Sequence, residues 1–221
     1  MNRTHALSEW ARELATQGQI PVDAKAYQDA GRDLYTPLIA TGPLDAAVGF
    51  FGRDPGRDEV RWLEPLIGAG GRLVRTGIYQ ATHGHPPADF DALRDASKLA
   101  FYSNTVPYKP IGNKPWPREV VAMFRPVIAE ALLLWQGEHL ITLGNDAFLW
   151  FGDEAEAFWA REDRYERSLT VTWPRRLTLH PLPHPSPANA IWHQKFPSML
   201  AHRLDALGVR PGTSGPVSMG A

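Results

Sequence analysis

Gly49-Phe-Phe-Gly-Arg-Asp-Pro-Gly56 is the stretch from which the architecture of this chain can be inferred. With residues 44–48 before it, the two phenylalanines predict a short buried strand, because a brief apolar run bounded by turn residues is typical of one. The strand runs into a turn in which Pro55 fixes its own backbone and the glycines let main chain approach a ligand closely. The pattern therefore places Asp54 at the carboxyl end of a strand. Taken alone, an aspartate that caps a strand-to-loop turn explains it equally well.

Strands and helices alternate along the rest of the chain. Further strands are expected at 99–103, 139–144 and 176–184, and helices at 5–17, 22–31, 118–135, 145–151 and 188–207, with another opening at 68–75. Residues 57–66 are expected to form a polar loop, the proline-rich residues 105–117 an irregular one, and residues 153–167 a helix with a surface excursion. This alternation predicts an α/β fold, a three-layer α/β/α sandwich around a four-stranded parallel sheet.

Length and composition are those of an ordinary globular protein. The 221 residues are 43% apolar and 21% charged, which suits one domain with a full core over residues 1–210. Residues 211–221 are rich in Gly, Ser and Pro and are expected to be disordered. No apolar run approaches 18 residues and no signal-peptide pattern is present, so we expect a cytoplasmic protein without a membrane partner.

The cysteine content and the charge distribution limit the kinds of catalysis and of ligand that this chain can have. The chain has no cysteine, which excludes disulfides, thiol catalysis and cysteine-ligated metal clusters. Its net charge is −1, but segments 96–118 and 168–204 each hold four Lys or Arg and no acidic residue. This asymmetry favours two basic faces on an acidic body, which would suit a polyanion such as a nucleic acid. Chance clustering is the alternative, because sequence counts carry no geometry.

Three polar side chains follow predicted strands. Because the carboxyl ends of parallel strands meet at one edge of a sheet, Asp54, Asn104 and His184 are expected to converge in a ligand-binding crevice. Taken alone, Asn104 is commonly a turn residue and His184 is more often a cap or turn residue, while the two interpretations of Asp54 are equally good. A different interpretation groups His180, His184 and His193 beside Asp54 as metal ligands, although the spacing matches no recognised metal motif.

Several of these stretches resemble those of one family. Residues 52–56 (Gly-Arg-Asp-Pro-Gly) and 184–189 (His-Pro-Ser-Pro-Ala-Asn) resemble the two signature motifs of the uracil-DNA glycosylase superfamily. Residues 104–113 resemble the Asn-Val-Val-Lys-Cys-Arg-Pro-Pro-x-Asn stretch of its iron–sulfur branch, and residues 64–73 resemble the Pro-Phe-Val-Gly-x-Ala-Gly-x-Leu stretch. The resemblance covers about residues 45–207 and is closest to a cysteine-free bacterial group related to that branch.

The chain also departs from the pattern of that branch. Tyr108 stands where the branch has a cluster cysteine, so no cofactor is expected. Arg53 stands at the branch's catalytic glutamate, and Asp54 instead aligns with the aspartate of the Gly-Gln-Asp-Pro-Tyr motif of classical uracil glycosylases. Those enzymes carry at the position of Gly56 a tyrosine that blocks the 5-methyl group of thymine.

Two further departures concern the base and the duplex. Leu66 replaces a phenylalanine that stacks on the base, and Ala188 stands at the intercalating wedge position, where Asn189 is a neighbour that could fill the gap. Together with Gly56, these residues suggest a roomier pocket and a looser substrate range.

The resemblance implies a monomeric, monofunctional uracil-DNA glycosylase of base excision repair. Such an enzyme flips uracil out of DNA, hydrolyses the N-glycosidic bond and releases free uracil, leaving an abasic site. Other deaminated or damaged bases remain open as substrates. The implied residues are Asp54 and His184 for catalysis; Arg53, Gly56, Leu66 and Asn104 for the base; and Gly68, Lys109, Ser186, Pro187, Ala188 and Asn189 for DNA.

Three alternatives stay open at this point. The same fold could capture uracil-containing DNA without turnover, through a covalent bond to a histidine. A metal-dependent hydrolase could use Asp54 with His180 and His184. A plain nucleic-acid-binding module would leave its DNA unmodified.

Overall fold

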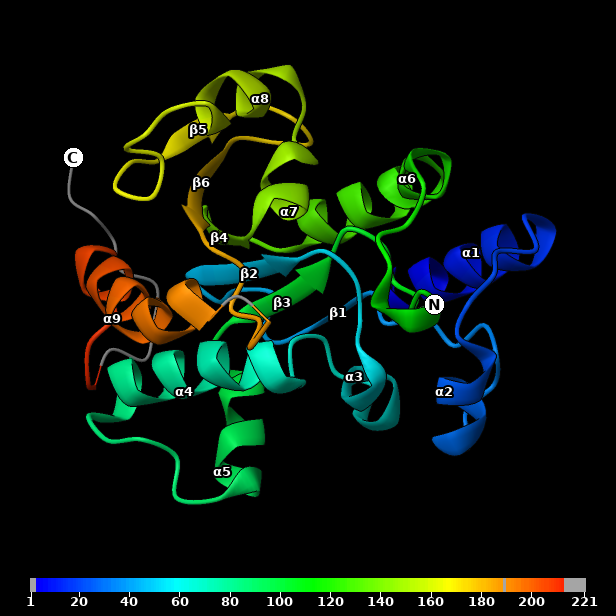
Figure 1. Ribbon diagram of the computed structural model, residues 1–221, viewed down its shortest axis with the longest axis horizontal. Coiled ribbons are helices and arrows are strands. Elements are labelled where there is room, and N and C mark those ends of the chain that lie inside the picture. Colours follow the sequence, from blue (N-terminus) through cyan, green and yellow to red (C-terminus); the bar gives the residue numbers. More distant parts are fainter. Residues whose placement is uncertain (1–2, 189, 213–221) are drawn as a thin grey trace.

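The computed structural model describes residues 3–188 and 190–212, which are arranged around one six-stranded sheet (Figure 1). The strand order is β1-β3-β2-β4-β6-β5. The strands are β1 (Ala40–Thr41), β2 (Val48–Gly52), β3 (Phe101–Asn104), β4 (His139–Leu143), β5 (Leu169–Val171) and β6 (Leu177–Leu182).

The centre of the sheet is the predicted set of four parallel strands. β3, β2, β4 and β6 pair in parallel, with Gly52 opposite Asn104 and Leu143 opposite Leu182. The α/β prediction is therefore confirmed. The structure adds an antiparallel strand at each edge, β1 beside β3 and β5 beside β6. These edge strands span two and three residues, too few for an apolar pattern to mark them in the sequence.

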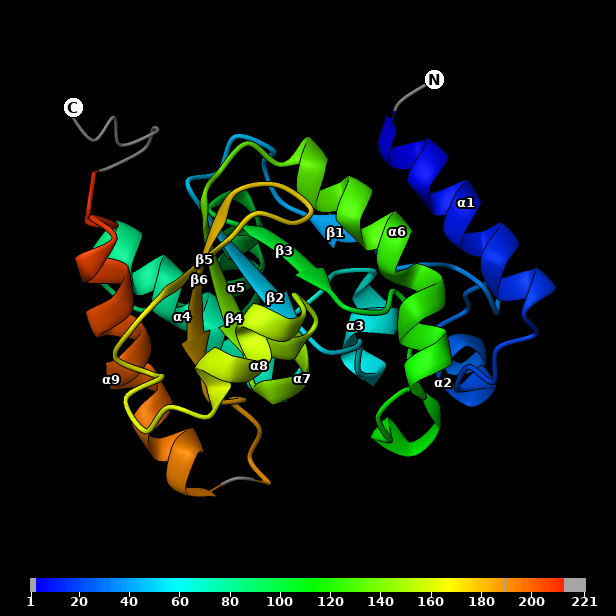
Figure 2. The same ribbon diagram turned by 90° about the horizontal axis from the view of Figure 1, so that it is seen from above.

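Helices cover both faces of the sheet, as Figures 1 and 2 show. Consecutive side chains of a strand point to opposite faces, so Phe50 packs in one core cluster and Phe51 in another. The cluster with Phe50 includes residues of α4 (Ala69–His83) and α9 (Ala190–Ala206). The cluster with Phe51 includes residues of α6 (Arg118–Leu134), α7 (Asn145–Leu149) and α8 (Asp153–Trp159).

A third cluster lies where the N-terminal part of the chain meets α6. Leu7, Ala11 and Ala15 on one face of α1 (Arg3–Gln17) pack with Phe124 of α6, and α2 (Ala24–Asp29) adds Tyr27. The amphipathic helix expected over 5–17 is thus confirmed. Its apolar face buries against α6, the helix beside it in Figure 2.

Two helices were not expected. Residues 57–62 form α3 (Arg57–Trp62) rather than a loop, because Glu59 accepts the backbone N–H of Gly56 and so caps the first turn. Asp89 similarly caps α5 (Phe90–Asp95) by accepting the N–H of Ala92 at 2.8 Å. Single turns of 3₁₀ helix lie at Ala96–Lys98 and Ile111–Asn113. Residues 213–221 of the predicted tail lie outside the described residues.

Within residues 3–188 and 190–212, no helix combines the length and the apolar character needed to cross a membrane.

Candidate active site

A pocket of about 830 Å³ opens at the carboxyl edge of the parallel strands. Four segments form most of its lining: the turn after β2, the start of α4, the loop after β3 and the loop after β6. Asp54, Asn104 and His184 all face this pocket, so the predicted convergence of the three strand ends is confirmed. The sheet supplies the geometry, because strand ends in register bring residues that are 130 positions apart in the chain (54 to 184) to one crevice.

Asp54 is the acidic residue that follows β2 in the pocket. Its side chain is 5% exposed, and its Oδ2 lies 2.5 Å from Nε of Arg53. Burial raises the pKa of Asp54, while the hydrogen bond and charge of Arg53 oppose that rise. The neighbouring guanidinium therefore favours an ionised carboxylate in a place that water reaches poorly.

Arg53 connects the turn after β2 to its surroundings. Its Nη2 donates to the carbonyl of Asn113 at 3.0 Å, and its Nη1 lies 3.6 Å from Oδ2 of Asp146. Its own carbonyl accepts the backbone N–H of Thr105 at 3.0 Å and also the Thr105 hydroxyl. The turn after β2 is thereby fixed to the end of β3.

Asn104 presents an amide whose hydrogen-bonding groups are unused. The residue is 1% exposed, and neither Oδ1 nor Nδ2 has a partner among the described residues. A Cβ on Gly52 would overlap Oδ1 of Asn104, so the glycine at this strand end makes room for the amide. Because a buried polar group without a partner costs free energy, the amide is suited to a ligand that supplies both a donor and an acceptor.

His184 lies at the mouth of the pocket, where its ring reaches solvent. Burial against the protein lowers the pKa of His184, and the charge of Arg53 lowers it further. Both effects favour the neutral imidazole, which can donate one N–H. Gly144, at a φ of 89°, allows the close approach of the two loops, because a Cβ there would lie 3.0 Å from that of His184.

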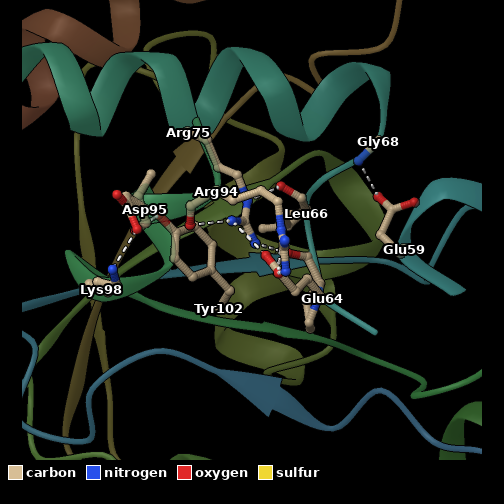
Figure 3. Close-up of polar contacts among 11 residues, drawn as sticks. Glu59, Glu64, Leu66, Gly68, Arg75, Arg94, Asp95, Lys98 and Tyr102 are labelled. Carbon is tan, nitrogen blue, oxygen red and sulfur yellow. Dashed lines mark hydrogen bonds and ion pairs between the residues drawn. The ribbon is translucent and has the colours of Figure 1, made fainter. Parts of the chain in front are cut away.

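Leu66 forms one wall of the pocket and has a left-handed backbone with a φ of 55°. The fully buried Arg75 holds that conformation, donating to the carbonyls of Leu66 at 2.7 Å and Pro65 at 2.9 Å (Figure 3). Its Nη1 also lies 3.0 Å from Oε2 of Glu64, which Arg94 contacts from the outer side. Sequence reasoning missed this network, whose members lie 9 to 30 residues apart.

Glu59 is a second residue that sequence reasoning missed. Its buried carboxylate accepts the N–H of Gly56 at 2.9 Å and that of Gly68 at 3.1 Å, as Figure 3 shows for Gly68. Burial raises the pKa of Glu59. The side chain joins the turn after β2 to the start of α4. The spacing of Gly56 and Glu59, which is that of a capping pair, was the available signal.

The residues expected to contact DNA differ in their accessibility. Pro187 and Ala188 are exposed beside the pocket, and Ser186 accepts the N–H of Ala188 at 3.2 Å. The N–H of Gly68 is already bonded to Glu59. Lys109 is 3% exposed and bonded within the protein. Asn189 lies outside the described residues.

The expectation of two basic faces needs correction for three of its eight cations. Lys109 pairs with Asp23 at 2.9 Å. Arg175 donates to the carbonyls of Leu132 and Gly137, and Arg203 donates to that of Tyr165 at 2.7 Å. These side chains therefore hold the protein together. A count of charges could not reveal these partners within the protein.

The histidines considered as metal ligands do not gather. His180 contacts His139 at 3.1 Å and Arg203 at 3.0 Å, while His193 contacts the carbonyl of Pro185 at 3.1 Å. Across residues 3–188 and 190–212, no group of three or more His, Asp or Glu side chains could hold a metal ion. The metal interpretation thus has no ligand cluster in that part of the chain.

The pocket at the carboxyl edge of this α/β fold thus combines a carboxylate, an amide without a partner and a histidine. Comparison with models of protein families identifies the family of this chain. The chain belongs to the uracil DNA glycosylase superfamily, whose model matches residues 39–208. No curated protein matches the chain significantly. Membership supports a DNA glycosylase with DNA as its substrate and leaves the target base open, because members of the superfamily differ in substrate.

Proposed function

We propose that this protein is a monofunctional glycosylase that excises uracil from DNA. The observation that carries the proposal is the buried, unpartnered amide of Asn104 in the same pocket as the carboxylate of Asp54. The products would be free uracil and an abasic site, as in base excision repair. We propose further that the protein acts as a cytoplasmic monomer.

The target nucleotide must first leave the base stack, which costs a few kcal/mol. Ser186, Pro187 and Ala188 lie beside the pocket, where they would contact the strand together with Asn189. The pocket would then receive the flipped base between Leu66, Gly56 and Asn104.

Asp54 would act on the sugar. As the N-glycosidic bond breaks, its electron pair leaves with N1 of the base and positive charge builds on the sugar. The carboxylate stabilises that charge and orients the water whose oxygen bonds to C1′. The water gives up one proton and the uracil anion takes one up at N1, so the products are neutral uracil and the abasic sugar. Arg53 would keep Asp54 ionised and in place, as its 2.5 Å contact supports.

His184 would act on the departing base. The negative charge of a leaving uracil collects partly on O2, and a neutral imidazole can donate an N–H to that oxygen. The lowered pKa of His184 supports the neutral form. Groups already in place that stabilise developing charge usually contribute more to catalysis than any other single effect.

Asn104 would select the base. Its Nδ2 can donate to O4 of uracil while its Oδ1 accepts N3–H. Cytosine presents an amino donor at N4 and an acceptor at N3. The donor Nδ2 of Asn104 would then face a donor, and the acceptor Oδ1 would face an acceptor. A buried mismatch of that sort costs more than the loss of one hydrogen bond.

The test uses a labelled single-stranded oligonucleotide with one uracil, in the presence of a chelator. Alkali converts any abasic site into a strand break. We expect a break at uracil with the wild-type protein and none with Asp54→Asn. A band shift that survives denaturation, without a break, would instead indicate capture through a histidine. An unmodified oligonucleotide would refute uracil excision, and xanthine and ethenocytosine would be tried next.

A further inference from the structure

The N-terminal segment reaches the pocket although the family match begins only at residue 39. Asp23, which precedes α2, lines the pocket together with Lys109 and Asn113 of the loop after β3. The matched region therefore lacks one of the side chains that complete the site in this protein.

Residues 22–27 hold this loop at several points. The N–H of Asp23 donates to the carbonyl of Lys109 at 3.0 Å, and Val22 forms an antiparallel bridge with Pro110. The N–H of Lys109 in turn donates to the hydroxyl of Tyr27 at 3.3 Å. Backbone and side-chain contacts thus fix the N-terminal segment to the loop.

Side-chain contacts continue from there to the catalytic carboxylate. Nζ of Lys109 lies 2.9 Å from Oδ2 of Asp23 and 2.9 Å from Oδ1 of Asn113. The carbonyl of Asn113 accepts Nη2 of Arg53 at 3.0 Å, and Nε of Arg53 reaches Asp54 at 2.5 Å. Four contacts therefore connect Asp23 with Asp54.

The loop depends on these contacts for its position. Gly112 and Asn113 both have left-handed backbones, at φ of 62° and 57°. A Cβ on Gly112 would have no neighbour within 4 Å, so that side of the turn is open. Lys109 contacts the side chain of Asn113 and Arg53 contacts its carbonyl, and both contacts hold Asn113 against the pocket.

We propose that Asp23 is a positioning residue that acts through Lys109 and Asn113 on the Arg53–Asp54 pair. The proposal rests on the proposed function of Asp54. Without Asp23, the buried ammonium of Lys109 loses a carboxylate partner and the turn shifts. Arg53 then turns toward Asp146, 3.6 Å away, and no longer orients the carboxylate of Asp54.

The first test compares Asp23→Asn with Asp29→Asn. Asparagine can still cap α2 through the N–H of Ala26, so the variant removes the charge and spares the helix. Asp29 is a matched control at the other end of α2, in a surface pair with Lys25. We expect Asp23→Asn to lower the single-turnover rate roughly tenfold at unchanged half-saturating DNA concentration, because small misplacements of catalytic groups are costly. The control should retain the wild-type rate. A folded Asp23→Asn with the wild-type rate would overturn the proposal.

A double-mutant cycle with Lys109→Met separates a network from two independent effects. We expect the double variant to lose no more activity than the worse single variant, since both interrupt the same connection. Multiplying losses would overturn the proposal. Should Asp23→Asn not fold, Asp23→Ser keeps a capping oxygen and replaces it.

Hydrogen exchange of peptides from residues 105–116 supplies a readout without activity. Asp23→Asn should exchange faster there while α6 stays protected, and unchanged exchange would overturn the proposal. An inactive wild-type protein would refute uracil excision, whereas the exchange data would still decide whether Asp23 orders this loop.

Discussion

Nε of Arg53 lies 2.5 Å from Oδ2 of Asp54, the next residue in the chain. Neighbours on a regular strand point to opposite faces, so this contact exists because the strand has ended and Pro55 has begun the turn. The pair places a cation beside the carboxylate that the proposed chemistry requires. It also makes the ionisation of Asp54 depend on Arg53.

Asp54→Asn should lower the single-turnover rate of uracil excision by about 100-fold or more, because an amide cannot stabilise the charge on the sugar as a carboxylate does. DNA binding measured by gel shift should survive. A rate close to that of the wild type would remove Asp54 from the mechanism.

Arg53→Met should shift the acidic limb of the pH–rate profile to higher pH. Burial raises the pKa of Asp54 and Arg53 opposes that rise, so its removal raises the pKa further and the carboxylate is lost at a higher pH. Lys109 lowers the same pKa from farther away.

Asp146→Asn is a control that should change the pKa of Asp54 in the opposite direction from Arg53→Met. The charge of Asp146 raises the pKa of Asp54, so its removal should move the acidic limb to lower pH. Limbs that move in the same direction in the Arg53 and Asp146 variants, or that do not move, would contradict the assignment of this limb to Asp54.

Asn104→Asp should abolish excision or admit cytosine, since a carboxyl group offers a different pattern of donors and acceptors to the base. Rates on matched oligonucleotides with uracil or cytosine measure the change. An unchanged preference for uracil would dismiss Asn104 as the residue that reads the base.

Arg75→Met should destabilise the protein by about 3–5 kcal/mol, because it removes the inner partner of Glu64 and leaves the carbonyls of Pro65, Leu66 and Arg94 without their donor. Arg94→Met removes the outer, partly exposed partner of Glu64 and should cost about 1 kcal/mol or less. Urea unfolding at constant pH measures both. If both variants lose the same free energy of unfolding, Arg75 does not stabilise the backbone at Leu66 more than Arg94 does.

The site was predictable from the sequence where it depends on strand ends. Asp54, Asn104 and His184 each follow an apolar run, and a parallel sheet must bring such positions together. Arg75 and Asp23 could not be found in this way, since their partners are set by packing. Lys109, for example, lies 86 positions from the aspartate that it pairs with. The strands β1 and β5 could not be predicted from the sequence either. They form only because β3 and β6 provide unpaired backbone groups at the edges of the sheet.

The unused amide of Asn104 has a consequence for evolution and engineering. Its donor and acceptor are withdrawn from water in the resting protein, so the folded state is less stable than a purely apolar interior of equal volume would make it. Asn104→Leu should therefore raise the free energy of unfolding and abolish the discrimination between bases. Selection for thermal robustness and selection for recognition act against each other at this one position.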